Sequence, residues 1–271
     1  FTVADHYSKT EADTLLAAKA PLASPSFTGN VGIGVTPEAH HNSHSALQVG
    51  GNGVWTSLKA QGASGEMDFQ HNAYYSQAHN GDRYISTDEA TKYRQVSGAH
   101  QWYTAGSGSA DAAISWRYGM QINNDGIVTK PLQPAFLVGS SGITNLAVNA
   151  YVTVPWNVSE IFDIGSNFAS NRFTAPVTGK YQLAVSLRVE NLDSASQYYI
   201  LQFTTSNRTY RIIFDPDFGQ DNGFWDFGLS TLADMDAGDT ATVEIHQASG
   251  TAQTDINASA NWSFFSGYLV C

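Results

Sequence analysis

The chain has 271 residues, 24 of them acidic and 13 basic, so its formal net charge at pH 7 is −11. Such an acidic surface repels phosphate backbones and anionic membranes, which excludes nucleic acid as an expected partner. The single cysteine, Cys271, excludes a disulfide framework, and no apolar run reaches the roughly eighteen residues that predict a membrane-spanning helix. Abundant glycine and 12% aromatic residues favour β-structure with tight turns.

Residues 1–24 contain the clearest helix signal. Ser8-Lys9-Thr10-Glu11 is a capping box, in which the serine and glutamate side chains each accept from a backbone N–H of the first turn. The sequence ADTLLAAKA then favours helix, and Pro21 ends it. A helix of about three turns is marginal alone. We therefore expect a short helical or coiled-coil segment, with a linker as the alternative.

Residues 31–35 alternate Val31, Ile33 and Val35 with Gly32 and Gly34, which predicts a strand. A dinucleotide-binding loop is excluded because no strand–turn–helix context follows and Pro37 interrupts. Glycines on one face instead let backbones approach closely, as around a threefold axis. The Tyr-Ser-Lys-Thr-Glu-Ala-Asp helix and the Pro-x-Phe-Thr-Gly-x-Val-Gly-Ile-Gly strand within residues 7–37 resemble shaft segments of bacteriophage tail fibres.

From residue 39 to 130 the pattern is one of short polar or aromatic strands between Gly, Asn and Asp turns. Residues 72–106 and 120–128 again resemble phage fibre shafts. Apolar runs are short and scattered, which suits an intertwined trimer in which each chain completes its neighbours' sheets. We expect residues 25–133 to form this trimeric β-rich shaft, with a monomeric irregular β-domain as the alternative.

The segment 130–134, with two prolines, is the expected linker. Beyond it the alternation strengthens in many short segments with frequent turn signals, which predicts a β-sandwich over residues 134–271. The expected strands are Ala147–Val154, Gly179–Val189, Tyr198–Thr204, Tyr210–Phe214, Phe224–Leu232, Thr240–His246 and Ala260–Val270.

Three motifs in this half carry a second resemblance. Phe173, Gly179 and Tyr181, followed by apolar alternation, resemble the core motif of the complement-type globular head, a relative of tumour necrosis factor. Residues 232–245 resemble that family's leucine, Gly-Asp and alternating strand, and residues 265–269 its closing strand. The resemblance implies a ten-stranded jelly roll that assembles as a homotrimer. The expected fold class is therefore all-β, with a helix, an intertwined shaft and a jelly-roll head.

Two clusters are candidate binding sites. His40, His41 and His44 lie close together, and a trimer axis could bring them to a metal ion, although solvated loop histidines are the simpler interpretation. In residues 215–228, Asp215, Asp217, Asp221 and Asn222 crowd oxygen ligands that suit calcium, and Trp225 adds a face for stacking a sugar. The alternative is that these aromatics enter the core and the acids cap turns.

Sequence motifs for catalysis are absent: there is no Gly-x-Ser-x-Gly, His-Glu-x-x-His or Walker loop. Glu66 and Asp68 could share a strand face and resemble the two catalytic carboxylates of a glycosidase, but exposed carboxylates on a strand are common. We expect no enzyme activity and no required cofactor, calcium being the one candidate.

These patterns together favour a structural adhesin of a phage virion. The chain starts at Phe1 without a signal-peptide pattern, and we interpret it as the C-terminal fragment of a trimeric tail fibre. Its head is expected to bind a host-surface receptor, a glycan, outside the host cell. Its other expected partners are its own copies and upstream fibre or baseplate proteins. The alternatives are a head that acts only as a trimerisation cap and chaperone, and a polysaccharide hydrolase.

Overall fold

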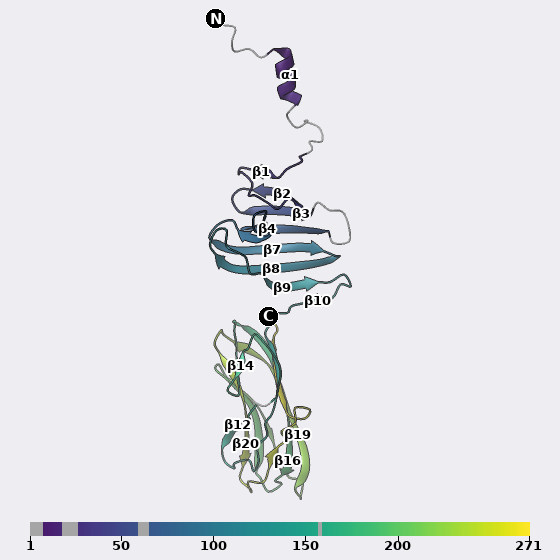
Figure 1. Ribbon diagram of the computed structural model, residues 1–271. Coiled ribbons are helices and arrows are strands. Elements are labelled where there is room, and N and C mark those ends of the chain that lie inside the picture. The colour runs from purple at the N-terminus through teal and green to yellow at the C-terminus, as the bar shows by residue number, and fades with distance from the viewer. Residues whose placement is uncertain (1–7, 18–26, 59–64, 157–158) are drawn as a thin grey trace. The chain divides into compact units, whose positions relative to one another are not determined.

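The computed structural model describes residues 8–17, 27–58, 65–156 and 159–271. It divides into two compact units, Phe1–Pro131 and Leu132–Cys271, and the division lies inside the proline-bounded segment 130–134 (Figure 1). Within the described residues, no helix has both the length and the apolar character needed to cross a membrane.

The predicted N-terminal helix is present as α1 (Lys9–Ala17). Its capping box forms as the sequence indicates: the Ser8 backbone N–H donates to Glu11 Oε2 at 2.8 Å, and the Glu11 N–H donates to Ser8 Oγ at 3.2 Å. The rest of the expected segment, residues 1–7 and 18–24, lies outside the described residues.

The first unit is built on an eight-stranded sheet with the order β1-β2-β3-β4-β7-β8-β9-β10 (Figure 1). Only β1 and β2 are parallel, and every other neighbouring pair is antiparallel. The strands are β1 (Val31–Ile33), β2 (His44–Val49), β3 (Gly53–Leu58), β4 (Glu66–His71), β7 (Asp88–Val96), β8 (Ala99–Gly108), β9 (Arg117–Ile122) and β10 (Val128–Thr129). These strands pair within one chain, whereas we expected neighbouring chains to complete each other's sheets.

A hairpin of β5 (Ala73–Ser76) and β6 (Gly81–Tyr84) covers one face of this sheet. It buries a small cluster of Ala73, Tyr84, Ala90 and Ala105, against which the segment before β9 packs. The predicted scarcity of apolar core in this half is therefore confirmed.

Gly32 and Gly34 have an explanation within one chain. A Cβ on Gly32 would lie 2.1 Å from the Val35 carbonyl oxygen, and Gly34 has a φ of +72° in the turn that follows β1. Both positions therefore require glycine for a local turn, whereas we expected the close approach of neighbouring chains.

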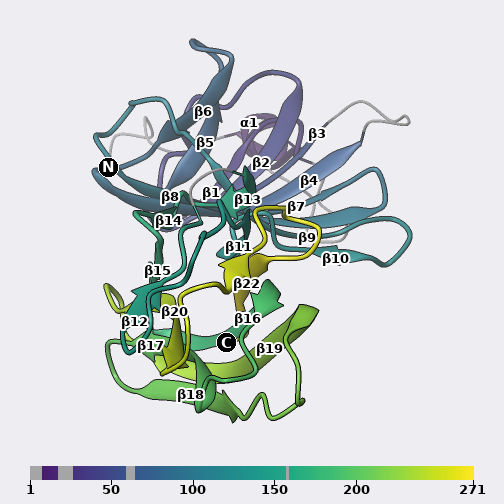
Figure 2. The ribbon, with the colours of Figure 1, turned by 90° about the horizontal axis from the view of Figure 1, so that it is seen from below.

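The second unit is a sandwich of two sheets, each with five strands in its main path and one short strand beside it (Figures 1 and 2). The first sheet has the order β13-β11-β22-β16-β19, with β21 on β16, and the second has β14-β15-β20-β17-β18, with β12 on β20. The first sheet contains β11 (Ala135–Gly139), β13 (Ser159–Ile164), β16 (Gly179–Leu192), β19 (Asn222–Met235), β21 (Asp255–Ile256) and β22 (Phe264–Leu269). The second contains β12 (Tyr151–Thr153), β14 (Phe168–Ala169), β15 (Arg172–Thr174), β17 (Tyr198–Thr205), β18 (Thr209–Phe214) and β20 (Thr240–Ala248).

The core between the sheets follows from strict alternation. Along β16 the buried residues are Tyr181, Leu183, Val185, Leu187 and Val189, while the intervening residues face outward. Each such buried side chain contributes on the order of 1.5–3 kcal/mol. An aromatic cluster closes one end of the core, where the rings of Phe136, Phe168, Phe173 and Phe265 pack together. The predicted sandwich is confirmed.

Candidate functional site

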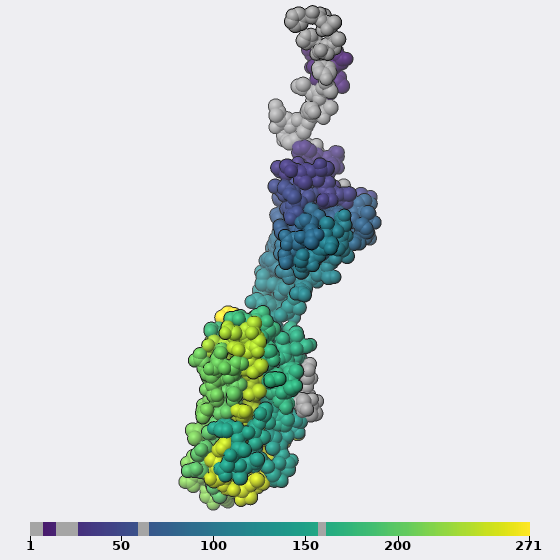
Figure 3. Space-filling model, turned by 90° about the vertical axis from the view of Figure 1, so that its left-hand side faces the viewer, coloured from purple at the N-terminus to yellow at the C-terminus, as the bar shows by residue number. Residues whose placement is uncertain are grey.

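The loop that joins β18 to β19 lies at one end of the sandwich. In the antiparallel pair of β16 and β19, Gly179 pairs with Met235 at one end and Leu192 pairs with Asn222 at the other. The chain enters the unit beside the first of these ends, where Lys180 N donates to the Cys271 carbonyl at 2.7 Å. Figure 3 shows the last residues, in yellow, at that end. The predicted site residues of the loop therefore occupy the opposite, distal end.

Trp225 is part of the scaffold of this end. Its ring stacks on Phe214 at 5.0 Å between centroids and packs against Phe218 at 5.1 Å, and it contacts the core because it faces the same way as Val189. Half-buried in this position, it orders the loop. The exposed aromatic of β19 is its neighbour Phe224, which is 68% exposed.

Asp221 ties three segments together. Its Oδ1 accepts from the Ser194 N–H and hydroxyl at 2.9 and 2.8 Å, and its Oδ2 accepts from Gln253 Nε2 at 2.8 Å. The bond from Gln253, then those from Ser194, lower the pKa of this exposed carboxyl below its usual value. Asp221 thus acts as a turn cap, as the alternative interpretation held, while Asp215 and Asp217 are exposed on the same loop.

The described residues contain no group of three His, Cys, Asp or Glu side chains placed to hold a metal ion. This applies both to Asp215, Asp217 and Asp221 and to the histidine cluster.

An exposed surface beside the loop was not singled out from the sequence. Arg188 of β16 places its guanidinium 3.3 Å from the ring centroid of Trp262 and 5.9 Å from that of Phe224, and its Nε donates to Asp226 Oδ1 at 3.2 Å. Trp262 is 47% exposed. We call Arg188, Phe224, Asp226 and Trp262 the distal platform. The sequence signal that could have revealed it is the alternation of side chains along β19. This alternation puts Phe224 and Asp226 on one face of the strand and Trp225 and Phe227 on the other.

A buried polar network holds the distal loops in place. Gln247 Nε2 donates to Ser196 Oγ at 2.8 Å and to the Thr251 carbonyl at 2.9 Å, and the Tyr199 hydroxyl bonds Thr254 Oγ1 at 2.7 Å. The Thr251 N–H donates to Asp193, so the loops on either side are joined. These bonds join the distal loops to β17 and β20, although Gln247 Oε1 is buried without a hydrogen-bond partner among the described residues.

The predicted histidine cluster is built into the first unit. His44 Nε2 lies 3.2 Å from Glu66 Oε1, and His40 is buried with its ring edge-on to Tyr74. Burial, and then the charge of His44, lower the pKa of His40 to about 4. His41 bonds Ser43 through Nδ1 at 2.7 Å. His40 and His44 are buried, so the expectation of solvated loop histidines is wrong for these two residues, and neither ring nitrogen of His40 has a hydrogen-bond partner among the described residues.

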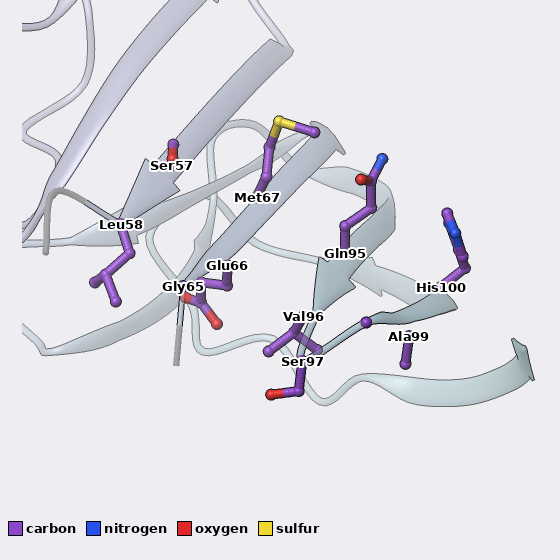
Figure 4. A pocket seen from close by; sticks show the side chains of 11 residues that line it. Ser57, Leu58, Gly65, Glu66, Met67, Gln95, Val96, Ser97, Ala99 and His100 are labelled. Carbon is purple, nitrogen blue, oxygen red and sulfur yellow. The ribbon is translucent and has the colours of Figure 1, made fainter. Parts of the chain in front are cut away.

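Glu66 and Asp68 lie on the covered face of β4, where Arg94 contacts both. A hollow of about 370 Å³ lies at the ends of β3, β4, β7 and β8. Figure 4 shows Met67, Gln95 and His100 projecting from one side of this sheet and Glu66 from the other. Among the described residues lining the hollow, Glu66 and His100 therefore do not face each other as an acid–base pair.

Comparisons with known proteins concern the C-terminal half. No family model matches the sequence, and curated proteins give no significant match. The globular domain of zebrafish complement 1qA is 16% identical, covering 51% of this chain and 98% of that one, with a TM-score of 0.38. Murine APRIL structures at pH 8.5 and pH 8.0 are 12% and 14% identical, each covering 51% of this chain and 99% of that one, with a TM-score of 0.38. All three likenesses concern about half of this chain, at 16% identity or less.

Proposed function

We propose that this chain is part of a bacteriophage tail fibre, whose sandwich unit binds a glycan on the host cell surface. The support from the sequence is the resemblance of residues 7–37, 72–106 and 120–128 to fibre shafts. In this role the protein belongs to the virion and acts outside the host, attached to upstream fibre or baseplate proteins.

The observation that carries the adhesive role is the distal platform. Phe224 and Trp262 are exposed aromatic side chains, on which the apolar faces of sugar rings can stack, and the Arg188 guanidinium already lies over one face of the Trp262 ring. Arg188 and Asp226 place a cation and a carboxylate beside these rings. Recognition sites combine apolar faces with a few fixed polar groups in this way. Asp215, Asp217 and Phe218 on the adjoining loop extend the same surface.

Adhesion through such a surface needs several copies. A single shallow site binds a sugar weakly, but three sites carried on one axis bind a multivalent surface with much higher avidity through effective concentration. The homotrimer is therefore part of the proposal, and several fibres on one particle would raise the avidity further.

The test is binding of the labelled full chain to a panel of bacterial strains and to their purified surface polysaccharides. Phe224→Ala and Trp262→Ala are expected to abolish binding without changing the far-ultraviolet circular dichroism. Ile213→Ala, a matched control, removes an exposed apolar side chain from β18 in the other sheet and is expected to leave binding unchanged. Equal binding by all three variants would remove the distal platform as the site.

A second candidate function is that of a trimerisation cap, and a specific surface favours it. On the outer face of the β13-β11-β22-β16-β19 sheet, Phe162, Leu232 and Tyr268 are 44%, 54% and 52% exposed. Leu232→Glu and Tyr268→Ser are expected, on this view, to lower the mass of the native assembly while Phe224→Ala does not. Unchanged mass in both would exclude the cap at this face.

A further inference from the structure

The sheet of the first unit carries an aromatic row on its uncovered face. Successive pairs in the register, each directly opposite the next, place these side chains in one line across six strands: Leu47, Trp55, Phe69, Tyr93, Trp102 and Met120. The rings of Trp55 and Phe69 stack with centroids 4.8 Å apart, and those of Tyr93 and Trp102 pack at a tilt with centroids 5.2 Å apart. Trp55 and Phe69 are nevertheless 44% and 40% exposed.

The opposite face of the same strands is the polar one, although it is covered. Asp68 and Arg94 pair beneath the hairpin, and Lys92 Nζ lies 2.7 Å from Asp82 Oδ2 of β6 and 4.7 Å from the ring centroid of Trp116. Burying charges carries a desolvation cost, whereas burying aromatic side chains is favourable. A sheet that covers its charges and exposes its aromatic row therefore has the polarity expected if the row is covered in the assembled protein.

The charge and shape of the face indicate what covers it. The aromatic row and the row on one side of it, which runs through Ser57, Met67, Gln95 and His100, contain no Asp, Glu, Lys or Arg. The row on the other side carries one charged residue, Arg117, at its end on β9. A symmetry axis that relates copies of the chain and runs parallel to the row would place each residue next to the same residue of another copy. Apolar side chains can pack in this way, whereas like charges would repel each other.

Protrusions and hollows alternate on this face. One hollow of about 370 Å³ lies beside Trp55 and is lined by Phe27, Val31, Leu47 and Met67. Another of about 280 Å³ lies on the other side of Trp55, against Val49 and Phe69. A face that carries both an exposed indole and apolar hollows next to it can fit a second copy of itself.

The area of this face, counted for two copies, reaches the roughly 1,000 Å² in total that is the lower bound for a specific interface. Strands spaced by about 4.8 Å make the row roughly 25 Å long, and three rows of side chains make the face roughly 20 Å wide. The resulting area, on the order of 500 Å² per copy and more with the neighbouring turns, approaches the ~800 Å² per partner of a standard interface.

We propose that copies of this chain pack together through the aromatic row, with Trp55 of one copy seated in the hollow beside Trp55 of the next. The inference deepens the proposed fibre function and rests on it only for threefold symmetry. The row is then the core of the shaft, supplied by several chains because none of the described segments of one chain covers it.

The test uses the full chain with Cys271→Ser, which removes the only native thiol. Ser57→Cys places a thiol on the uncovered face, and Ser109→Cys places an exposed one on the segment that covers the opposite face. With a short bis-maleimide, Ser57→Cys is expected to give covalently joined chains and Ser109→Cys only single chains. Equal cross-linking of both, or of neither, would overturn the proposal.

Trp55→Ser, added to Ser57→Cys, is expected to abolish the cross-link, and Trp55→Phe to retain it, both with unchanged circular dichroism. A cross-link that survives Trp55→Ser in the folded protein would also overturn the proposal, as would a single-chain native mass at all concentrations. Binding to bacterial cells separates the two hypotheses. If Ser57→Cys gives no cross-link but the protein still binds bacterial cells, this interface alone is overturned. If the cross-link forms but the protein does not bind cells, the adhesive function alone is overturned.

Discussion

Arg94 holds Asp68 through two parallel hydrogen bonds, its Nε and Nη2 each lying 2.8 Å from a different carboxylate oxygen. Its Nη1 is also 3.3 Å from Glu66 Oε2, and Glu66 in turn faces His44. The bond to Asp68 raises the pKa of Arg94, and the bond from His44 lowers the pKa of Glu66. The covered face of the first sheet is therefore held by a connected network of charges.

Removing the cation from this network should be costly. Arg94→Met removes both hydrogen bonds that the guanidinium makes to the buried carboxylate of Asp68, and the loss is expected to be about 3–5 kcal/mol in the free energy of unfolding of the first unit. Arg117→Met, at an exposed position, is expected to change it by less than about 0.5 kcal/mol. Urea unfolding measures both, and equal effects would show that the network does not stabilise the fold.

The first unit is expected to lose stability on acidification through His40. Its pKa falls from 6.5 to about 4 on folding, so between these values the unfolded chain binds more protons than the folded one. Protonation of His40 therefore does not lower the free energy of unfolding above pH 6.5. As the pH falls from 6.5 to 4, it lowers this free energy by roughly 3 kcal/mol in total.

Unfolding free energies measured from pH 7 to pH 4 check this expectation. His40→Gln should flatten the dependence, whereas His79→Gln, at an exposed turn, should not. The same slope in both variants would assign the acid sensitivity to other groups.

The distal network predicts a strong effect at Gly250. Its φ is +80°, and a Cβ there would lie 2.3 Å from Asp193 Oδ2 and 2.8 Å from Ser196 Oγ. Gly250→Ala is therefore expected to cost about 1–3 kcal/mol by displacing buried hydrogen-bonded groups. Gly223→Ala, where no atom lies within 4 Å, serves as the control. Thermal unfolding of the second unit measures both variants. Equal midpoints for Gly250→Ala and Gly223→Ala would show that the distal network does not depend on glycine at position 250.

Much of the second unit could be predicted from the sequence because its strands obey strict alternation. Tyr181, Leu183 and Val185 point inward on β16, as their spacing indicates. The distal platform was harder to predict. Trp225 and Phe224 are adjacent aromatics, and only the pairing of β19 with β16 decides that Trp225 faces the core and Phe224 the solvent.

The first unit could be predicted less well because its two faces invert the usual pattern. Charged residues on a strand predict its solvent-facing side. Here the charged residues Asp68, Lys92 and Arg94 lie instead beneath the β5–β6 hairpin. Long-range contacts such as Gln253 with Asp221 also leave no local signal, since they depend on loops brought together by the fold.

The order of strands in the two units has a consequence for folding. In the first sheet each strand pairs with one close to it along the chain, with a single hairpin inserted between β4 and β7. The second unit instead joins its beginning to its end, since Leu137 pairs with Ser266. Local pairings form quickly and distant ones slowly. During synthesis the first sheet can thus form while the ribosome is still making the second unit, whose closure must wait for its final strand.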